Sequence, residues 1–149
     1  MRLLLRSLWQ DHAGAAVIET ALVAPLLVIM ALGVFDVSGL VARQTEIQDV
    51  AAEISQISMA RPPETGDDIA QLEEIAVAAA KVDDDDVDIT LLYRCDNSDT
   101  LVDDDELCTG DETSTMIQIE IEAVYTPQWV EFGVAEPVTL SVVRTSQIG

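Results

Sequence analysis

The chain has 149 residues, of which 49% are hydrophobic and only 4% are aromatic. This length leaves room for one modest globular domain, and the scarcity of aromatic residues argues against an aromatic-lined ligand pocket. Seven basic residues against 28 acidic ones give a formal net charge of −21, which repels nucleic acid and anionic lipid headgroups. We therefore expect no nucleic-acid partner.

The N-terminal part of the chain contains one long apolar segment. Over residues 15–35 the only ionisable side chain is Glu19, and at about 1.5 Å per residue this length covers a hydrocarbon core of about 30 Å. Because Arg2 and Arg6 precede the segment, the positive-inside rule places residues 1–14 in the cytoplasm and the chain from Asp36 onward outside. The sequence thus predicts a single-pass protein of a bacterial inner membrane, with its C-terminal domain in the periplasm.

A cleaved secretory signal is the rival interpretation of this segment. Ala31, Leu32 and Gly33 loosely resemble the small-residue cleavage site of such signals. The apolar run is long for a signal, however, and it contains a carboxylate. A helical pattern also continues beyond it, so we favour a retained anchor.

Residues 36–61 are predicted to continue the membrane helix as an amphipathic one. Apolar residues recur there at helical spacing, and the helix should stop near Ala60 or Arg61 because the two prolines that follow cannot continue it. The apolar face consists of Leu40, Ile47, Val50, Ala51, Ile54 and Ile57. Within the membrane part, Pro25 removes a backbone hydrogen bond, which predicts a kink or a local loosening.

Residues 62–149 form the predicted outer domain. Asp67 or Asp68 can cap a short helix that ends near Lys81. Its expected apolar face consists of Ile69, Leu72, Ile75, Ala76 and Ala79. The segments around 87–93, 117–125 and 138–142 alternate apolar and polar residues, which is typical of strands that bury one face.

The predicted fold class is α+β. It combines the long N-terminal transmembrane and amphipathic helix, one short helix, and a small antiparallel sheet packed on the outer part of the long helix. The acidic segments 83–86 and 96–112 are interpreted as loops. We expect the aromatic side chains of Tyr93, Tyr125, Trp129 and Phe132 to close the small core.

The two cysteines, Cys95 and Cys108, both lie in the part of the chain assigned to the oxidising exterior. A disulfide is therefore predicted, and closing a loop of this size contributes about 3 kcal/mol in the chain-entropy model. A metal site is a poor alternative because two thiols have no histidine nearby: the only histidine, His12, lies in residues 1–14 and would be lost if the chain is cleaved after Gly14. We expect neither a metal nor another cofactor.

The acidic residues of the outer part raise the possibility of calcium binding. Carboxylates are suitable ligands, but the EF-hand loop pattern with its glycine at the turn is missing. We interpret these residues as a solvated acidic surface. A generic membrane-anchored periplasmic binding domain, with or without calcium, is the alternative function.

Catalysis is not predicted. The sequence has no Gly-x-Ser-x-Gly elbow, no phosphate-binding glycine loop and no histidine-based metal motif. The chemistry of this chain is therefore expected to be that of a structural or interaction protein rather than an enzyme.

Gly14 and Glu19 mark the start of the apolar segment. In the plain interpretation, Glu19 is a tolerated charge close enough to the helix end to reach the interface. Alternatively, cleavage after Gly14 frees an α-amine on Ala15, with a reference pKa of about 8, and Glu19 neutralises the amine of a neighbouring subunit. Such a pair would set the register between packed helices more than it would add stability.

These residues resemble the TadE-like (TadE/TadG) pseudopilin family of tight-adherence, Flp-type pilus systems. The resemblance covers roughly residues 13–60 and includes the leader that ends in Gly14, the run AVIETALVAPLLVIMALGVFDVSGL, and a Glu-x-Ala-Leu-x-x-Pro core. The core residues are Glu19, Ala21, Leu22 and Pro25. The chain departs from the family pattern at Thr20, where an aromatic residue commonly follows the glutamate.

The resemblance implies a part in building an adhesive pilus. It implies that a prepilin peptidase cuts between Gly14 and Ala15, and that the helix is retained as an assembly element with Glu19 as the assembly carboxylate. The implied partners are the peptidase, other pilin and pseudopilin subunits, and the pilus assembly platform. Major pilins of these systems are very short, so the sizeable outer domain favours a minor subunit or initiator.

Overall fold

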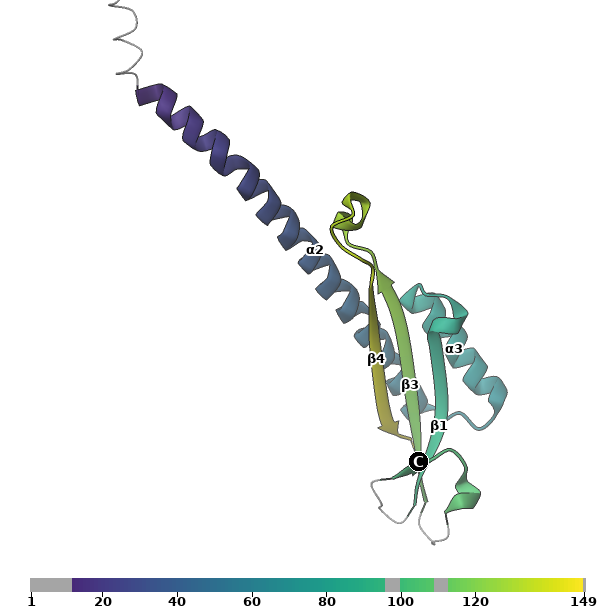
Figure 1. The fold of residues 1–149 in the computed structure, drawn as a ribbon. Coiled ribbons are helices and arrows are strands. Elements are labelled where there is room, and N and C mark those ends of the chain that lie inside the picture. Colours follow the sequence, from purple (N-terminus) through teal and green to yellow (C-terminus); the bar gives the residue numbers. More distant parts are fainter. Residues whose placement is uncertain (1–11, 96–99, 109–112, 149) are drawn as a thin grey trace, which may run out of the picture. The chain divides into compact units, whose positions relative to one another are not determined.

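The computed structural model describes residues 12–95, 100–108 and 113–148, without the side chains of residues 12–16 and 132. The chain divides into two compact units, residues 1–39 (unit 1) and residues 40–149 (unit 2). Figure 1 shows the order of their helices and strands.

The longest element is helix α2, His12–Ala60, which is shared by the two units. It ends before Pro62 and Pro63, as the sequence predicts, because neither residue can donate the next helical hydrogen bond. Its helical assignment continues through Pro25. The kink expected at that residue stays a prediction.

The N-terminal part of α2 combines great length with exposed apolar side chains. Val17–Ala60 includes a strongly apolar stretch of which no part is buried. Among the described residues, this is the helix that is long and apolar enough to cross a bilayer, a property that signal sequences share.

Helix α3, Gly66–Ala80, begins with a capping box. The cap is Thr65, not the predicted Asp67 or Asp68: the Thr65 hydroxyl accepts a hydrogen bond from the backbone N–H of Asp68, and the Asp68 carboxylate accepts one from the backbone N–H of Thr65. Asp68 therefore stands three residues inside the cap. At the other end, Lys81 takes a left-handed conformation (φ 54°) and ends the helix where the sequence predicts.

The sheet has four antiparallel strands in the order β2-β1-β3-β4. They are β1 (Val87–Cys95), β2 (Leu101–Val102), β3 (Thr113–Tyr125) and β4 (Val138–Gln147). The three predicted strands are confirmed, each longer than the alternating pattern alone indicates. The two-residue β2 is an addition, paired with the end of β1.

Three short 3₁₀ helices complete the described structure: η1 (Asp84–Asp86), η2 (Asp105–Leu107) and η3 (Gln128–Phe132). The interpretation of 83–86 and 96–112 as loops was therefore wrong in part, because η1, β2 and η2 lie within them. Residues 96–99 and 109–112 lie outside the described residues.

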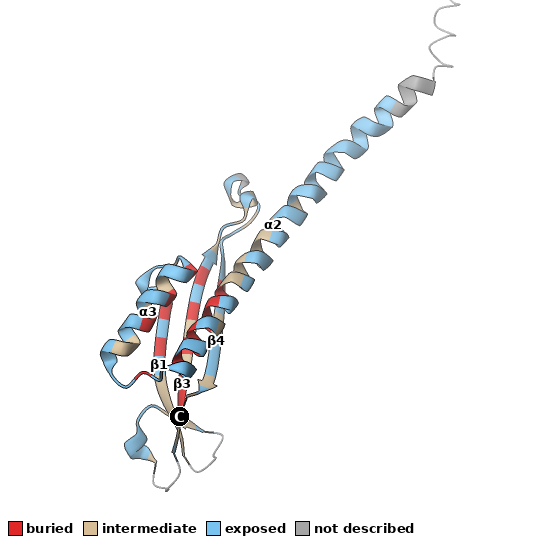
Figure 2. Ribbon diagram, turned by 180° about the vertical axis from the view of Figure 1, so that it is seen from behind, coloured by how far each residue is buried: buried red, intermediate tan, exposed pale blue. Residues whose placement is uncertain are grey.

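The core of unit 2 lies between one face of the sheet and the two helices, which cover the same face (Figure 2). It is made of short and branched aliphatic side chains: Ile47, Val50, Ala51 and Ile54 from α2; Leu72, Ala76 and Ala80 from α3; and Val87, Ile89, Ile117, Ile119, Ile121, Ala123 and Leu140 from the sheet. The predicted α+β architecture is confirmed.

Two predicted apolar faces need correction at their edges. Ile57 on α2 and Ile75 on α3 are 36% and 43% exposed, and Ala79 is exposed as well. Ala80 is fully buried instead, because helix α3 turns the positions 69, 72, 76 and 80 toward the sheet, the recurrence expected for a single helical stripe.

Candidate functional site

The predicted cleavage point lies near the beginning of α2. Gly14 and Ala15 are helical, and the side chain of Ala15 is not among those that the structure describes. The structure therefore places this peptide bond in a helix and adds no contact to it. Its cleavage stays a prediction.

Glu19 lies one turn further along the same helix and is exposed. Together with Thr20, Val23, Ala24 and Leu27 it lines a shallow depression on the surface of α2. A carboxylate is costly in lipid or against another apolar helix unless it is paired or reaches the membrane interface. The pairing of Glu19 with a neighbouring amine stays a prediction.

The surface around Glu19 is apolar over many helical turns. Large hydrophobic side chains that are at least 39% exposed follow one another along α2: Val17, Ile18, Leu22, Val23, Leu26, Leu27, Val28, Ile29, Met30, Leu32, Val34, Phe35, Val37 and Val41. They occur all round the helix, and a helix that is apolar on all sides is stable when lipid or other helices surround it. We call this set the exposed apolar surface.

An ion cluster joins α2 to the end of α3 within unit 2. Glu46 accepts hydrogen bonds from Arg43 Nη1 at 2.8 Å and from Lys81 Nζ at 3.0 Å, while Arg43 Nη2 donates to the Lys81 carbonyl oxygen at 3.4 Å. The hydrogen bond from Arg43, and then that from Lys81, lowers the pKa of the Glu46 carboxyl. The cluster fixes the place where α3 ends against α2.

The sequence analysis missed this cluster. The pair Arg43 and Glu46 has the three-residue spacing of helical ion pairs and could have been found from the sequence. Lys81 could not, since its approach to Glu46 depends on how α3 packs on α2.

A contact between α2 and the sheet lies further along the helix. The hydroxyls of Ser55 and Ser146 are 2.7 Å apart, and Ser55 is fully buried. Buried hydroxyls need such partners, so this contact fixes the position of α2 over β4.

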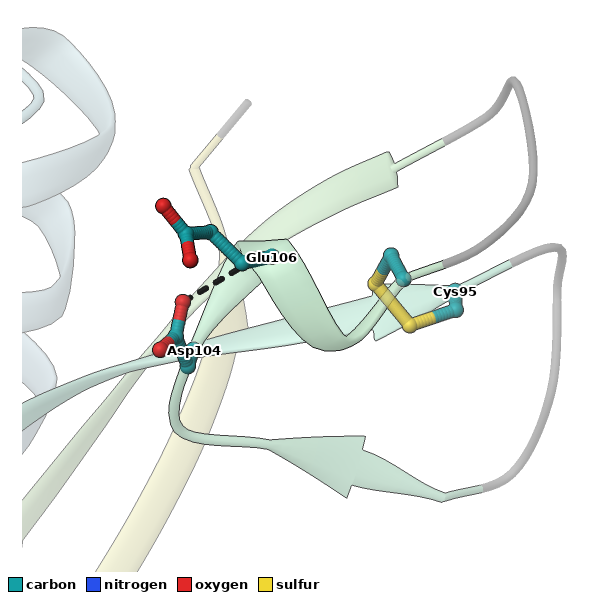
Figure 3. The surroundings of a disulfide bond; sticks show 4 residues. Cys95, Asp104 and Glu106 are labelled. Carbon is teal, nitrogen blue, oxygen red and sulfur yellow. Dashed lines mark hydrogen bonds between the residues drawn. A yellow bond between two sulfur atoms is a disulfide. The ribbon is translucent and has the colours of Figure 1, made fainter.

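The disulfide joins Cys95, at the end of β1, to Cys108, just after η2 (Figure 3). The Cα atoms are 5.2 Å apart, within the usual range for a bridge. Asp104 caps η2 by accepting a hydrogen bond from the backbone N–H of Glu106 at 2.9 Å. The predicted disulfide is confirmed, and it ties the acidic η2 segment to the end of β1.

The described residues contain no group of three or more His, Cys, Asp or Glu side chains arranged to hold a metal ion. The carboxylates of 83–85 and of 103–106 are exposed. Asp68 is different in one respect, because hydrogen bonds from the Thr65 side chain and from the Glu64 backbone lower the pKa of its carboxyl. That effect belongs to the capping box.

Comparison with known proteins gives one match. Residues 14–55 match the family model described as TadE-like protein, which covers the exposed apolar surface and the first part of unit 2. No curated protein and no solved structure matches the chain.

Proposed function

The chain is a member of the TadE-like family over residues 14–55, and on this premise we propose that it is a minor pseudopilin that assembles or initiates a tight-adherence, Flp-type pilus. Its role is structural: it binds other subunits and catalyses no reaction. Family membership supports a part in the biogenesis of this pilus, and the size of unit 2 supports the role of a minor subunit.

One observation carries the proposal. Helix α2 is continuous: its N-terminal part carries the exposed apolar surface, and its C-terminal part is packed in the core of unit 2. A lone apolar helix of this length is stable in a bilayer or among other helices, because both satisfy its side chains. The same helix can therefore act as an anchor in the inner membrane and as a packing element among pilin subunits.

The proposed topology follows from this anchor. Residues 1–14 are a cytoplasmic leader, residues 15–35 span the inner membrane once, residues 36–61 continue the helix outward, and residues 62–149 form the periplasmic domain with its disulfide. The partners are the prepilin peptidase, other pilin and pseudopilin subunits, and the assembly platform.

Glu19 is the proposed assembly carboxylate. After removal of the leader, the α-amine of Ala15 on one subunit lies in an apolar environment and needs a counter-charge, which Glu19 of a neighbouring subunit provides. Pro25, six residues further on, is the proposed flexible point of the helix as subunits move from the bilayer into the filament.

The experiment is complementation of a deletion strain, with three readouts: protein level, N-terminal peptide mass and surface pili. We expect the mature chain to begin at Ala15, and Gly14→Val to block the cut. A chain that begins only at Met1 would contradict the pseudopilin assignment, and a chain that begins at Val34 would show that a secretory signal was removed instead.

The Glu19→Ala variant separates an assembly role from a tolerated charge. If the carboxylate pairs with a neighbouring amine, the variant should be inserted and cleaved normally yet fail to support pili, because the amine loses its partner in a medium of low dielectric constant. Asp49→Ala, which removes an exposed carboxylate from the same helix in unit 2, is the matched control. Normal pili with a stable and cleaved Glu19→Ala protein would reject the assembly role.

A further inference from the structure

The connection between β3 and β4, residues 126–137, carries an apolar tip on an ordered turn. Its helix η3 is preceded by Pro127 and followed by Gly133, whose φ of 68° is the left-handed conformation that glycine adopts easily. Two backbone hydrogen bonds close the turn, from Gly133 N to Val130 O at 3.0 Å and from Val134 N to Trp129 O at 3.1 Å. The backbone of the tip is thus held in place by the turn itself.

The apolar side chains of this tip are incompletely covered. Val134 is 73% exposed, and Trp129 and Val130 are half-buried. Trp129 was expected to close the core, but it lies outside the core cluster. The tip thus presents a valine and one of the chain's two tryptophans, both incompletely covered, on an ordered turn.

The tip projects from the end of the sheet at which α2 enters unit 2. Arg43 and Glu46 of α2 contact Lys81, and the chain passes from there through η1 to Val87, the first residue of β1. Val87 pairs with Ile121, close to the end of β3, where the connection begins (Figure 1). At the opposite end of the sheet, α2 contacts β4 through Ser55 and Ser146.

This end of unit 2 is bonded directly to the exposed apolar surface. Val37 is 64% exposed and Val41, already in unit 2, is 55% exposed, so the apolar character of α2 reaches unit 2 itself. If the segment 15–35 spans a bilayer, only a few residues at about 1.5 Å each separate the bilayer from the first residues of unit 2. Within unit 2, the tip lies at the end where α2 enters, which is the end joined to the anchor by the fewest residues.

We propose that the β3–β4 tip docks on the periplasmic surface of the bilayer, with Trp129 at the boundary between headgroups and acyl chains. This inference rests on the membrane anchoring proposed above. Tryptophan favours this boundary because its ring is apolar while its N–H remains hydrogen-bonded to water or headgroups. The contact gives unit 2 a second point of attachment to the bilayer.

The charges of the tip indicate which lipid headgroups it can contact. Glu131 and Glu136 are exposed, and the described residues of 126–137 include no basic side chain. Anionic headgroups would therefore repel the tip, and the contact depends on apolar burial. The fitting surface is a bilayer rich in zwitterionic lipid.

The test is quenching of tryptophan fluorescence in the full chain reconstituted into phosphatidylcholine vesicles whose acyl chains are brominated near the headgroup. Trp9→Phe leaves Trp129 as the single tryptophan. Two reporters are built on the variant that lacks both tryptophans: Phe35→Trp on the anchor, and Leu107→Trp on η2, where the side chain is 60% exposed at the other end of the sheet.

We expect brominated lipid to quench Trp129 at least twofold more than Leu107→Trp, and Phe35→Trp to be quenched strongly. Quenching of Phe35→Trp with Trp129 as bright as Leu107→Trp would overturn this inference and leave the anchor standing. An unquenched Phe35→Trp would overturn the anchor and the inference together.

A matched pair of variants tests the contact itself. Val134→Glu adds a charge to the tip and should reduce the quenching of Trp129 severalfold, whereas Val143→Glu, at a position on β4 that is 56% exposed, should leave it unchanged. Replacing a third of the lipid with phosphatidylglycerol should weaken the quenching. The fluorescence of Trp129 could instead change with protein concentration and stay the same with brominated and ordinary lipid. That result would show contact with a second copy of the chain and overturn the proposal.

Discussion

The two units of the chain use the same helix in opposite ways. In unit 1, α2 carries large apolar side chains that no other part of the described chain covers. In unit 2 it buries Ile47, Val50, Ala51 and Ile54 and exposes charged residues such as Asp49 and Glu53. The difference lies in the spacing of apolar residues, which is continuous in the first part and helical in the second. A helix can thus be matched to two environments by its pattern alone.

The largest expected effect tests this difference between the units by truncating one apolar side chain in each of them. Ile119 is fully buried in the core, so Ile119→Ala should lower the free energy of unfolding of unit 2 by about 4 kcal/mol, through lost burial and a residual cavity. The measurement is denaturant unfolding of the full chain in detergent, followed by circular dichroism.

Leu26→Ala is the control in unit 1. Leu26 is 58% exposed and lies outside the core of unit 2, so its truncation should leave that unfolding transition where it is. Equal effects of the two substitutions would show that the exposed part of α2 and the core unfold as one cooperative structure.

The disulfide provides the next largest expected effect. Replacing both Cys95 and Cys108 with serine should lower the free energy of unfolding of unit 2 by about 3 kcal/mol, because a loop of 13 residues in sequence separation is no longer closed in the unfolded chain. Unit 1 contains no part of this loop, so membrane insertion should be unaffected. An unchanged denaturation midpoint for the double variant would show that the bridge adds nothing to the fold.

Most of the fold could be predicted because its signals are local. Alternation at Ile117, Ile119 and Ile121 identifies β3, and Pro62 marks the end of α2, since both patterns depend on backbone geometry alone. The two residues of β2 could not be found in this way. They form a strand only because β1 extends far enough to pair with Leu101.

The features of the candidate site also differ in whether their signal is local in the sequence. The disulfide of Cys95 could be predicted because two cysteines in a loop assigned to the exterior are conspicuous in a sequence. Glu19 is as conspicuous, being a carboxylate in an apolar run, and its role stays a prediction. The contact between Lys81 and Glu46 depends on the tertiary position of two helices and has no sequence signal. The choice of Thr65 over Asp67 as the cap was a matter of two residues, the usual uncertainty of helix boundaries.

The capping box allows a smaller and local test of unit 2. Thr65→Ala removes the hydroxyl that accepts a hydrogen bond from the Asp68 N–H, and should destabilise unit 2 by about 1 kcal/mol. Thr65→Ser keeps the hydroxyl and should remain within a few tenths of a kcal/mol of the unsubstituted protein. If serine proves as harmful as alanine, the threonine acts through its methyl group and the cap assignment is wrong.

The smallest expected effect concerns Glu46, and it tests whether α2 and α3 are held together by charge. Because hydrogen bonds from Arg43 and Lys81 lower the pKa of the Glu46 carboxyl, the ionised form is favoured in the folded protein. The resulting stability is present above the usual carboxyl pKa of about 4.3 and is lost as the pH falls through the lowered value of the folded state.

Glu46→Gln should therefore lower the thermal unfolding midpoint of unit 2 slightly at pH 7, and the difference from the unsubstituted chain should shrink below about pH 4. High salt should reduce the difference as well, because the cluster is partly exposed to solvent. Glu53→Gln removes an equal charge from an exposed position of the same helix and is the control for net charge. A gap between Glu46→Gln and the unsubstituted chain that persists at pH 3 would assign the effect to packing of the side chain, and the two helices would then be joined by apolar contacts alone.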